Sequence, residues 1–199
     1  MEGTVKSIAV DADNQLIYWA NYKYQRIGRA TLTGGNVEEK FIPNAGGVIG
    51  LVLDTTNNML YWTDIKNGRI QRVDLADPSP TPETLYSKKN APGSISHPYG
   101  IALDVPNNMV YWTDVGTKSI QRAPMSGGTA ADVENLVSSK KFPGLKYFNR
   151  IRGIALDPDN NRMYWAIQLP SKIQYTDLNG NNAPVTMDFC ASTCTNPLV

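Results

Sequence analysis

The amino-acid sequence predicts an all-β protein, specifically a β-propeller with four blades. A phrase that starts with an apolar run and contains a Tyr-Trp pair occurs four times in the 199 residues. The copies are IAVDADNQLIYWAN at 8–21, LVLDTTNNMLYWTD at 51–64, IALDVPNNMVYWTD at 101–114 and IALDPDNNRMYWAI at 154–167. Repetition at roughly 40–50 residues indicates stacked supersecondary units. No segment carries a sustained helical period, so alternating strands and helices are not expected.

Each unit predicts short strands separated by turns. An apolar run such as 101–103 ends in an Asp and an Asn-rich turn, a strand with Tyr-Trp follows, and a third strand has the pattern of 70–75. A fourth, weaker strand fits 83–86 and 133–137. Clusters of Asp, Asn, Pro and Gly bound these runs, as is typical of strands. Four antiparallel strands in 40–50 residues are the blade of a propeller.

The repeats also predict the domain organisation. We expect a propeller region at 1–189 and a Cys-containing tail at 190–199. Within the propeller region, the expected blades are about 5–45, 46–95, 96–148 and 149–189.

The repeated aromatic and acidic residues are interpreted as scaffold. Tryptophan recurs at one position of every unit and would bury a large area, with an indole N–H that needs a partner. A carboxylate at the end of the second strand can accept backbone N–H bonds and tie one blade to the next. Because a catalytic group is not repeated once per blade, structural roles are expected for Tyr61, Trp62, Asp64, Tyr111, Trp112 and Asp114.

The motif YWTD at 61–64 and 111–114 resembles the class B repeat of the low-density lipoprotein receptor family. The resemblance covers about residues 5–188, although YWAN at 18–21 and YWAI at 164–167 depart from the motif, so weaker ties between blades are expected there. The resemblance implies a six-bladed propeller in an extracellular or cell-surface protein that binds a protein or glycoprotein ligand.

Four blades in place of six leave two arrangements open, a partial arc or a small closed ring. Blades of fixed wedge angle do not close at four without strain, so we expect an arc. Its first and fourth blades would each expose one apolar face, which another chain, a second copy in a homo-oligomer, or missing residues would cover.

The composition is that of a globular domain with a net charge of +1. No apolar run reaches 18 residues, so membrane insertion is not expected. The first residues, MEGTVKSIAVD, lack an apolar segment, so no signal peptide is visible in this chain. Three explanations remain open: a leader was removed earlier, the chain is an internal fragment, or the protein is not secreted.

Cys190 and Cys194 stand close together in the tail DFCASTCTNPLV. Three interpretations remain open: the two cysteines form a local disulfide, they belong to a truncated Cys-rich module, or they are free thiols. A metal site would need two more ligands, and the single histidine is far away in sequence. We therefore expect no metal and no cofactor.

Sequence motifs of enzymes are absent: there is no G-x-S-x-G, phosphate loop, H-E-x-x-H or C-x-x-C. A Ser–His–Asp site would have to use His97, which precedes Pro98 at a blade entrance, where a turn role is the simpler account. No catalytic residue is expected, and a propeller-fold hydrolase is the weaker alternative to a binding module or an assembly protein.

Basic residues gather in two kinds of connection that share one end of the blades, namely those entering each blade and those joining its second and third strands. Apart from the motif aspartates, these connections contain no acidic residue. Such a basic end attracts anionic partners, and Tyr beside Arg is typical of interface hot spots. We expect it to bind a protein ligand, through an acidic segment or a sulfated glycan, and not nucleic acid. The expected binding residues are Tyr22, Lys23, Lys66, Arg69, His97, Tyr99, Lys118, Arg150, Arg152 and Lys172.

Overall fold

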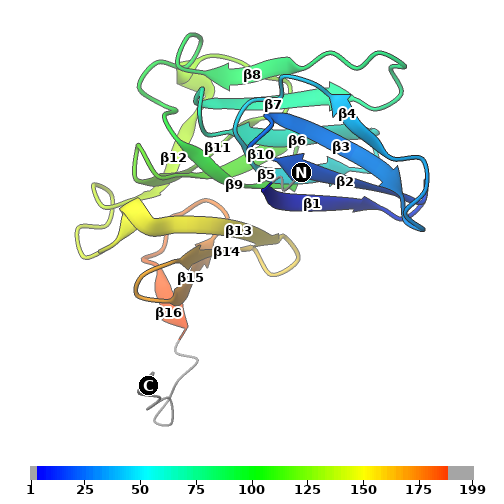
Figure 1. The fold of residues 1–199 in the computed structure, drawn as a ribbon. Helices are drawn as coiled ribbons and strands as arrows, with labels where there is room; N and C mark the ends of the chain where they lie inside the picture. The colour runs from blue at the N-terminus through cyan, green and yellow to red at the C-terminus, as the bar shows by residue number, and fades with distance from the viewer. Residues whose placement is uncertain (1–3, 188–199) are drawn as a thin grey trace, which may run out of the picture.

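The computed structural model describes residues 4–187, and its regular structure is almost entirely β (Figure 1). Sixteen strands form four four-stranded antiparallel sheets, and in each sheet the strands are neighbours in chain order. This is the β-propeller architecture that the repeats predict. Cys190 and Cys194 lie outside the described residues. No helix among residues 4–187 is long and apolar enough to cross a membrane.

The sheets are numbered here as blades in chain order. Blade 1 comprises β1 (Val5–Asp11), β2 (Leu16–Asn21), β3 (Arg26–Thr31) and β4 (Glu38–Ile42). Blade 2 comprises β5 (Val48–Asp54), β6 (Met59–Asp64), β7 (Arg69–Asp74) and β8 (Glu83–Ser87). Blade 3 comprises β9 (Pro98–Asp104), β10 (Met109–Asp114), β11 (Ser119–Pro124) and β12 (Glu134–Ser138). Blade 4 comprises β13 (Ile151–Asp157), β14 (Arg162–Ile167), β15 (Lys172–Asp177) and β16 (Val185–Met187). Two short 3₁₀ turns, η1 (Ala130–Asp132) and η2 (Phe148–Arg150), precede β12 and β13.

The Asp and Asn residues of the repeat form the first hairpin turn of every blade. In blade 2, Asp54 accepts hydrogen bonds from the backbone N–H and the side-chain amide of Asn57, at 3.0 and 2.8 Å. The next residue, Asn58, has a φ of 53°, in the left-handed region that Asn tolerates. The same bonds recur in the other blades, from Asn14 to Asp11, Asn107 to Asp104 and Asn160 to Asp157. The repeated D-x-x-N pattern is therefore a turn signal.

Alternation along the strands gives each blade two different faces. In blade 2, Tyr61 pairs with Val52 and Arg72, whereas Trp62 pairs with Leu51 and Gln71, and side chains of successive strand residues point to opposite sides. We call these sides the Tyr face and the Trp face.

Three apolar clusters join the blades among the described residues. Each cluster combines the Tyr face of one blade with the Trp face of the next: Tyr18 lies in the cluster of Trp62, Tyr61 in that of Trp112, and Tyr111 in that of Trp165. The first strands β1, β5, β9 and β13 contact one another in that order. The core of the protein is thus a series of interfaces between consecutive blades.

Residues 4–187 form an open arc and not a closed ring. Trp62, Trp112 and Trp165 are fully buried, whereas Trp19 of blade 1 is partly exposed. At the other end, Tyr164 of blade 4 is partly exposed although its three equivalents are buried. In Figure 1, blade 4 (yellow to red) stands at one end of the molecule, with β16 farthest from the other sheets.

Candidate binding surface

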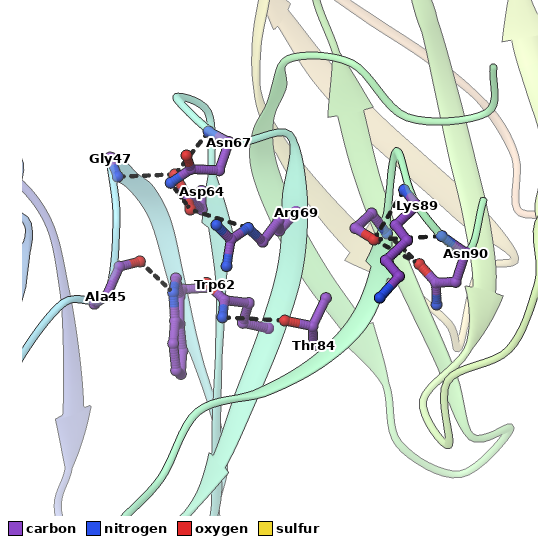
Figure 2. Close-up of polar contacts among 11 residues, drawn as sticks. Ala45, Gly47, Trp62, Asp64, Asn67, Arg69, Thr84, Lys89 and Asn90 are labelled. Atoms are coloured by element: carbon purple, nitrogen blue, oxygen red, sulfur yellow. Dashed lines mark hydrogen bonds and ion pairs between the residues drawn. The ribbon is translucent and has the colours of Figure 1, made fainter. Parts of the chain in front are cut away.

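The motif aspartates fix the loops at the predicted basic end. Asp64 accepts hydrogen bonds from the backbone N–H of Gly47 and Asn67, at 2.8 and 3.2 Å, and from the Asn67 side chain at 2.7 Å (Figure 2). Gly47 lies in the connection that enters blade 2, the blade to which Asp64 itself belongs. Asp64 therefore anchors the entrance of its own blade. The tie to the next blade that we expected from the sequence is not what this side chain forms.

Asp114 repeats this arrangement in blade 3. It accepts hydrogen bonds from the backbone N–H of Ser96 and His97, at 2.7 and 3.0 Å, and from Gly116 and Thr117, both at 2.9 Å. The blade 3 entrance and the β10–β11 turn are thereby held together. In blades 1 and 4, Asn21 and Ile167 occupy this position.

The indole N–H groups of the motif tryptophans differ in whether they have a hydrogen-bond partner. Trp62 donates to the Ala45 carbonyl oxygen at 3.0 Å (Figure 2). The buried Nε1 atoms of Trp112 and Trp165 have no hydrogen-bond partner within residues 4–187. The expected partner for the indole is therefore found in one blade only.

Blade 2 carries an open cavity of about 690 Å³ with a basic and polar lining. Its cationic groups are Arg69 at the start of β7 and Lys88 and Lys89 on the connection toward β9. Within the described part of the chain, Arg69 has one ionic contact, from its Nε to Asp64 at 3.8 Å, and neither lysine has an acidic group within 4.0 Å. The remaining lining residues are polar: Asn67, Thr84, Ser87 and Asn90.

The loop that carries the two lysines is held by Asn90. The Asn90 side chain accepts a hydrogen bond from the Ser87 backbone N–H at 2.7 Å and donates to the Leu85 and Gly128 carbonyl oxygens at 2.7 and 2.9 Å. Because Gly128 belongs to the connection within blade 3, Asn90 also joins neighbouring blades. Figure 2 shows Lys89 and Asn90 on this loop and Arg69 beside Asp64.

Two further pairs place cations over tyrosine rings. The Lys66 ammonium lies 4.9 Å from the ring centre of Tyr22, which reaches from blade 1 to blade 2. The Arg152 guanidinium lies 4.9 Å from the ring of Tyr99, which joins blade 3 to blade 4. Arg152 also donates from Nε and Nη2 to the Gln168 side-chain oxygen, at 3.0 and 2.6 Å. Both pairs therefore hold the basic side chains in place beside an aromatic ring.

The other predicted binding residues lie apart from the cavity. The exposed ring of His97 contacts the Ser96 hydroxyl through Nδ1 at 2.9 Å. Arg150 donates to the Leu169 carbonyl oxygen at 3.4 Å. Lys23, Lys118 and Lys172 are exposed on separate blades. The ten predicted residues are thus spread over loops and strand ends of four blades, and only Arg69 among them lines the cavity.

Sequence reasoning missed an Arg–Glu ion pair that is repeated in blades 1 to 3. Arg72 pairs with Glu83 at 2.7 Å and donates from Nη1 to the Met125 carbonyl oxygen of blade 3 at 2.8 Å. Arg122 pairs with Glu134 at 2.9 Å and donates to Leu178 of blade 4 at 3.3 Å. The signal was available, because an Arg recurs eleven residues after each motif Tyr except Tyr164.

Among residues 4–187, no group of three or more His, Cys, Asp or Glu side chains could hold a metal ion. A second cavity, of about 260 Å³, lies where the four first strands meet. Its lining is glycine, aliphatic residues, Ser7, Lys6 and Tyr99.

Solved structures resemble this chain in fold. A chain in the crystal structure of a nidogen/laminin complex is 26% identical, with a TM-score of 0.65 over 86% of this chain and 60% of that chain. A catalytically inactive virginiamycin B lyase from Staphylococcus aureus with quinupristin is 19% identical, with a TM-score of 0.70 over 95% of this chain and 56% of the other. Hydrazine synthase from Kuenenia stuttgartiensis is 10% identical, with a TM-score of 0.68 and coverages of 90% and 48%.

The chain therefore spans about half to three fifths of the length of these solved chains. No protein-family model and no curated protein sequence matches it. The likenesses show a β-propeller fold, and they include both a protein found in a complex with another protein and an enzyme.

Proposed function

We propose that this chain is a non-catalytic protein-interaction module of the YWTD propeller type, whose basic end binds an acidic segment of a protein ligand. The observation that carries this proposal is the blade 2 cavity, in which Arg69, Lys88 and Lys89 face polar groups and have little acidic compensation. The likeness to a chain crystallised in a nidogen/laminin complex supports a protein partner and an extracellular setting.

The geometry of the cavity suits a carboxylate-rich ligand. Cationic side chains on two loops can contact successive acidic groups, and the asparagine and serine groups can donate further hydrogen bonds. Lys66 on Tyr22 and Arg152 on Tyr99 extend the cationic surface onto neighbouring blades. Encounter with an anionic ligand would then be accelerated at low salt and slowed as salt rises.

Binding to poly-glutamate, measured by fluorescence anisotropy at several salt concentrations, tests the proposal. Lys88→Glu and Lys89→Glu should each weaken binding by about tenfold or less, and together by more. Lys40→Glu is the charge-matched control, because Lys40 is exposed on β4 away from the cavity lining. Equal losses from Lys88→Glu and Lys40→Glu would show that only net charge matters and would refute the site.

A sulfated glycan is the finer alternative for the ligand, and heparin is the matching probe. If heparin binds and poly-glutamate does not, with the same dependence on Lys88 and Lys89, the site holds but its ligand is a glycan. The enzyme alternative rests on the likeness to a lyase. Loss of an ester- or lactone-cleaving activity on His97→Ala, with binding unchanged, would favour it.

A further inference from the structure

The Trp face of blade 1 has the composition of a buried interface, yet it is exposed. Ile8 is 57% exposed, whereas its equivalents Leu51 and Ile101 are 7% and 8% exposed. Leu32 is 41% exposed, whereas its equivalent Met125 in blade 3 is 3% exposed. Val5, Val10 and Trp19 are likewise more exposed than their equivalents in the other blades.

The Tyr face of blade 4 shows the complementary contrast. Ile173 and Met187 form a cross-strand pair that is partly exposed, whereas the matching pair Ile70 and Tyr86 of blade 2 is fully buried. Ala155 is exposed, although Ala9 and Ala102 at this position are buried. Terminal repeats that face water usually carry a polar outer surface. On the Tyr face of blade 4, one exposed cation is present: Arg162 donates to the Tyr164 hydroxyl at 3.5 Å and lies 4.9 Å from the ring centre of Tyr175.

Gly153 points to a missing neighbour on this same face. At the equivalent Gly50, an added Cβ would lie 2.6 Å from the carbonyl oxygen of Tyr99, in the first strand of the next blade. At Gly100, it would lie 2.5 Å from the Arg152 carbonyl oxygen, again in the next blade. In blades 2 and 3, glycine therefore stands where the following first strand packs closely, whereas blade 1 has Ser7 at this position. At Gly153, no atom lies within 4 Å of an added Cβ, so the glycine is present without the strand that explains it elsewhere.

We propose that two copies of this chain associate head to tail, with the Trp face of blade 1 of one copy packed against the Tyr face of blade 4 of the other. The two open faces are of opposite kinds, and these two kinds already pack together three times within the chain. A single chain thus supplies both halves of the contact. The contact is heterologous, so a ring forms if the rotation closes, and a longer assembly forms if it does not.

The proposed contact is largely apolar and lacks two polar links of the internal interfaces, and its one cation is Arg162, which stands where the other blades have Leu16, Met59 and Met109. Ala166 stands where Thr63 and Thr113 donate to the next blade, and Tyr175 stands where Arg72 and Arg122 do. Association would therefore depend on burial of the aliphatic and aromatic side chains, which favours pairing in proportion to the apolar area removed from water. We expect it to be reversible and concentration-dependent, and only weakly affected by salt.

Complementing variants test the pairing. Ile8→Glu places a charge on the Trp face of blade 1, and Ala155→Glu places one on the Tyr face of blade 4; both sites are exposed, so both variants should fold. By analytical ultracentrifugation, the wild type should self-associate, and each variant alone should do so at least about tenfold more weakly. An equimolar mixture should form dimers, because it retains one intact face of each kind.

The controls make each outcome decisive. Val37→Glu also charges an exposed apolar residue, but Val37 lies in the connection between β3 and β4, and this variant should associate like the wild type. Gly153→Ala should fold normally and weaken association, because the added methyl group meets only the incoming strand. A wild type that stays monomeric at all concentrations overturns the proposal. So does a mixture of the two Glu variants that remains monomeric, or a single variant that associates like the wild type.

Discussion

The hydroxyl of Thr63 donates a hydrogen bond to the carbonyl oxygen of Tyr99, 2.7 Å away across the boundary between blades 2 and 3. The same hydroxyl accepts a bond from the backbone N–H of Gly50 at 2.8 Å, within its own blade. One side chain therefore satisfies backbone groups of two adjacent first strands. Thr113 does the same between Gly100 and Arg152, at 2.9 and 2.6 Å.

Thr63→Val should destabilise the protein by about 1–3 kcal/mol, because it keeps the side-chain shape but leaves two partly buried backbone groups unpaired. Thr63→Ser, which retains the hydroxyl, should recover most of the loss. Urea denaturation measures both variants. Thr81→Val, at an exposed position in the β7–β8 connection, is the control and should change stability little. Equal stability of the Val and Ser variants at 63 would contradict the assigned role.

Truncation of the motif tryptophans should have unequal effects. Trp62→Ala and Trp112→Ala remove fully buried side chains and should each cost about 3–5 kcal/mol. Trp19→Ala should cost clearly less, because that ring is partly exposed and lies on Gly28 of its own sheet. Thermal unfolding followed by far-ultraviolet circular dichroism makes the comparison. If all three variants melt alike, the assignment of an open Trp face on blade 1 is wrong.

Arg122→Met should destabilise the junction of blades 3 and 4. The substitution keeps much of the aliphatic stem but removes the bonds from Arg122 to Glu134, the Tyr111 hydroxyl and the Leu178 carbonyl oxygen. We expect a loss of about 1–3 kcal/mol by urea denaturation, more than for Arg26→Met, whose ion pair with Glu39 stays within blade 1. Equal losses would mean that the contact with blade 4 contributes nothing.

Alkaline pH should destabilise the protein from about pH 10 upward. Burial raises the pKa of Tyr86 from 10.0 to about 12, and it also raises the pKa values of Tyr18, Tyr61 and Tyr111. The unfolded chain therefore loses these protons first, so the free energy of unfolding is unaffected below pH 10 and falls as the pH rises toward 12. Each unit of pKa difference contributes about 1.4 kcal/mol.

Tyr86→Phe should reduce this alkaline loss, because the residue that replaces Tyr86 does not titrate. The variant also lacks the bond from the Tyr86 hydroxyl to the Pro124 carbonyl oxygen, 3.0 Å long, so it should be less stable than the wild type near neutral pH. Urea denaturation at several pH values between 7 and about 11.5 separates the two effects. An unchanged slope above pH 10 would show that Tyr86 is not among the groups responsible.

The fold could be predicted from the sequence because its signals are local and repeated. The D-x-x-N turns and the apolar runs fix a hairpin within about twenty residues of chain, whatever surrounds them. The burial of Trp62 also follows from repetition. The partial exposure of Trp19 could not be predicted in this way. Its burial depends on a neighbouring blade, and the first repeat contains no pattern that indicates whether such a blade is present.

The candidate site was harder to predict, because it depends on the register between strands. Lys88, Lys89 and Arg69 come together because Arg69 at the start of β7 pairs with Ser87 at the end of β8, and the two lysines follow Ser87 directly. Charge along the chain indicated the basic end but not the position of the cavity. Arg26 at the start of β3 follows the connection after the first Tyr-Trp pair, yet its guanidinium contacts Glu39 at 2.6 Å. Only three-dimensional pairing shows which cations remain uncompensated.

The succession of Tyr-face to Trp-face contacts has a kinetic consequence. Each blade contacts its neighbours in the chain, so the structure behaves as a short one-dimensional array whose units cooperate with the nearest ones. Blades 2 and 3 are supported on both sides, and the terminal blades on one side only. Amide protons of β6 and β10 should therefore exchange with solvent last, and those of β3 and β15 earlier, as the array opens from its two ends.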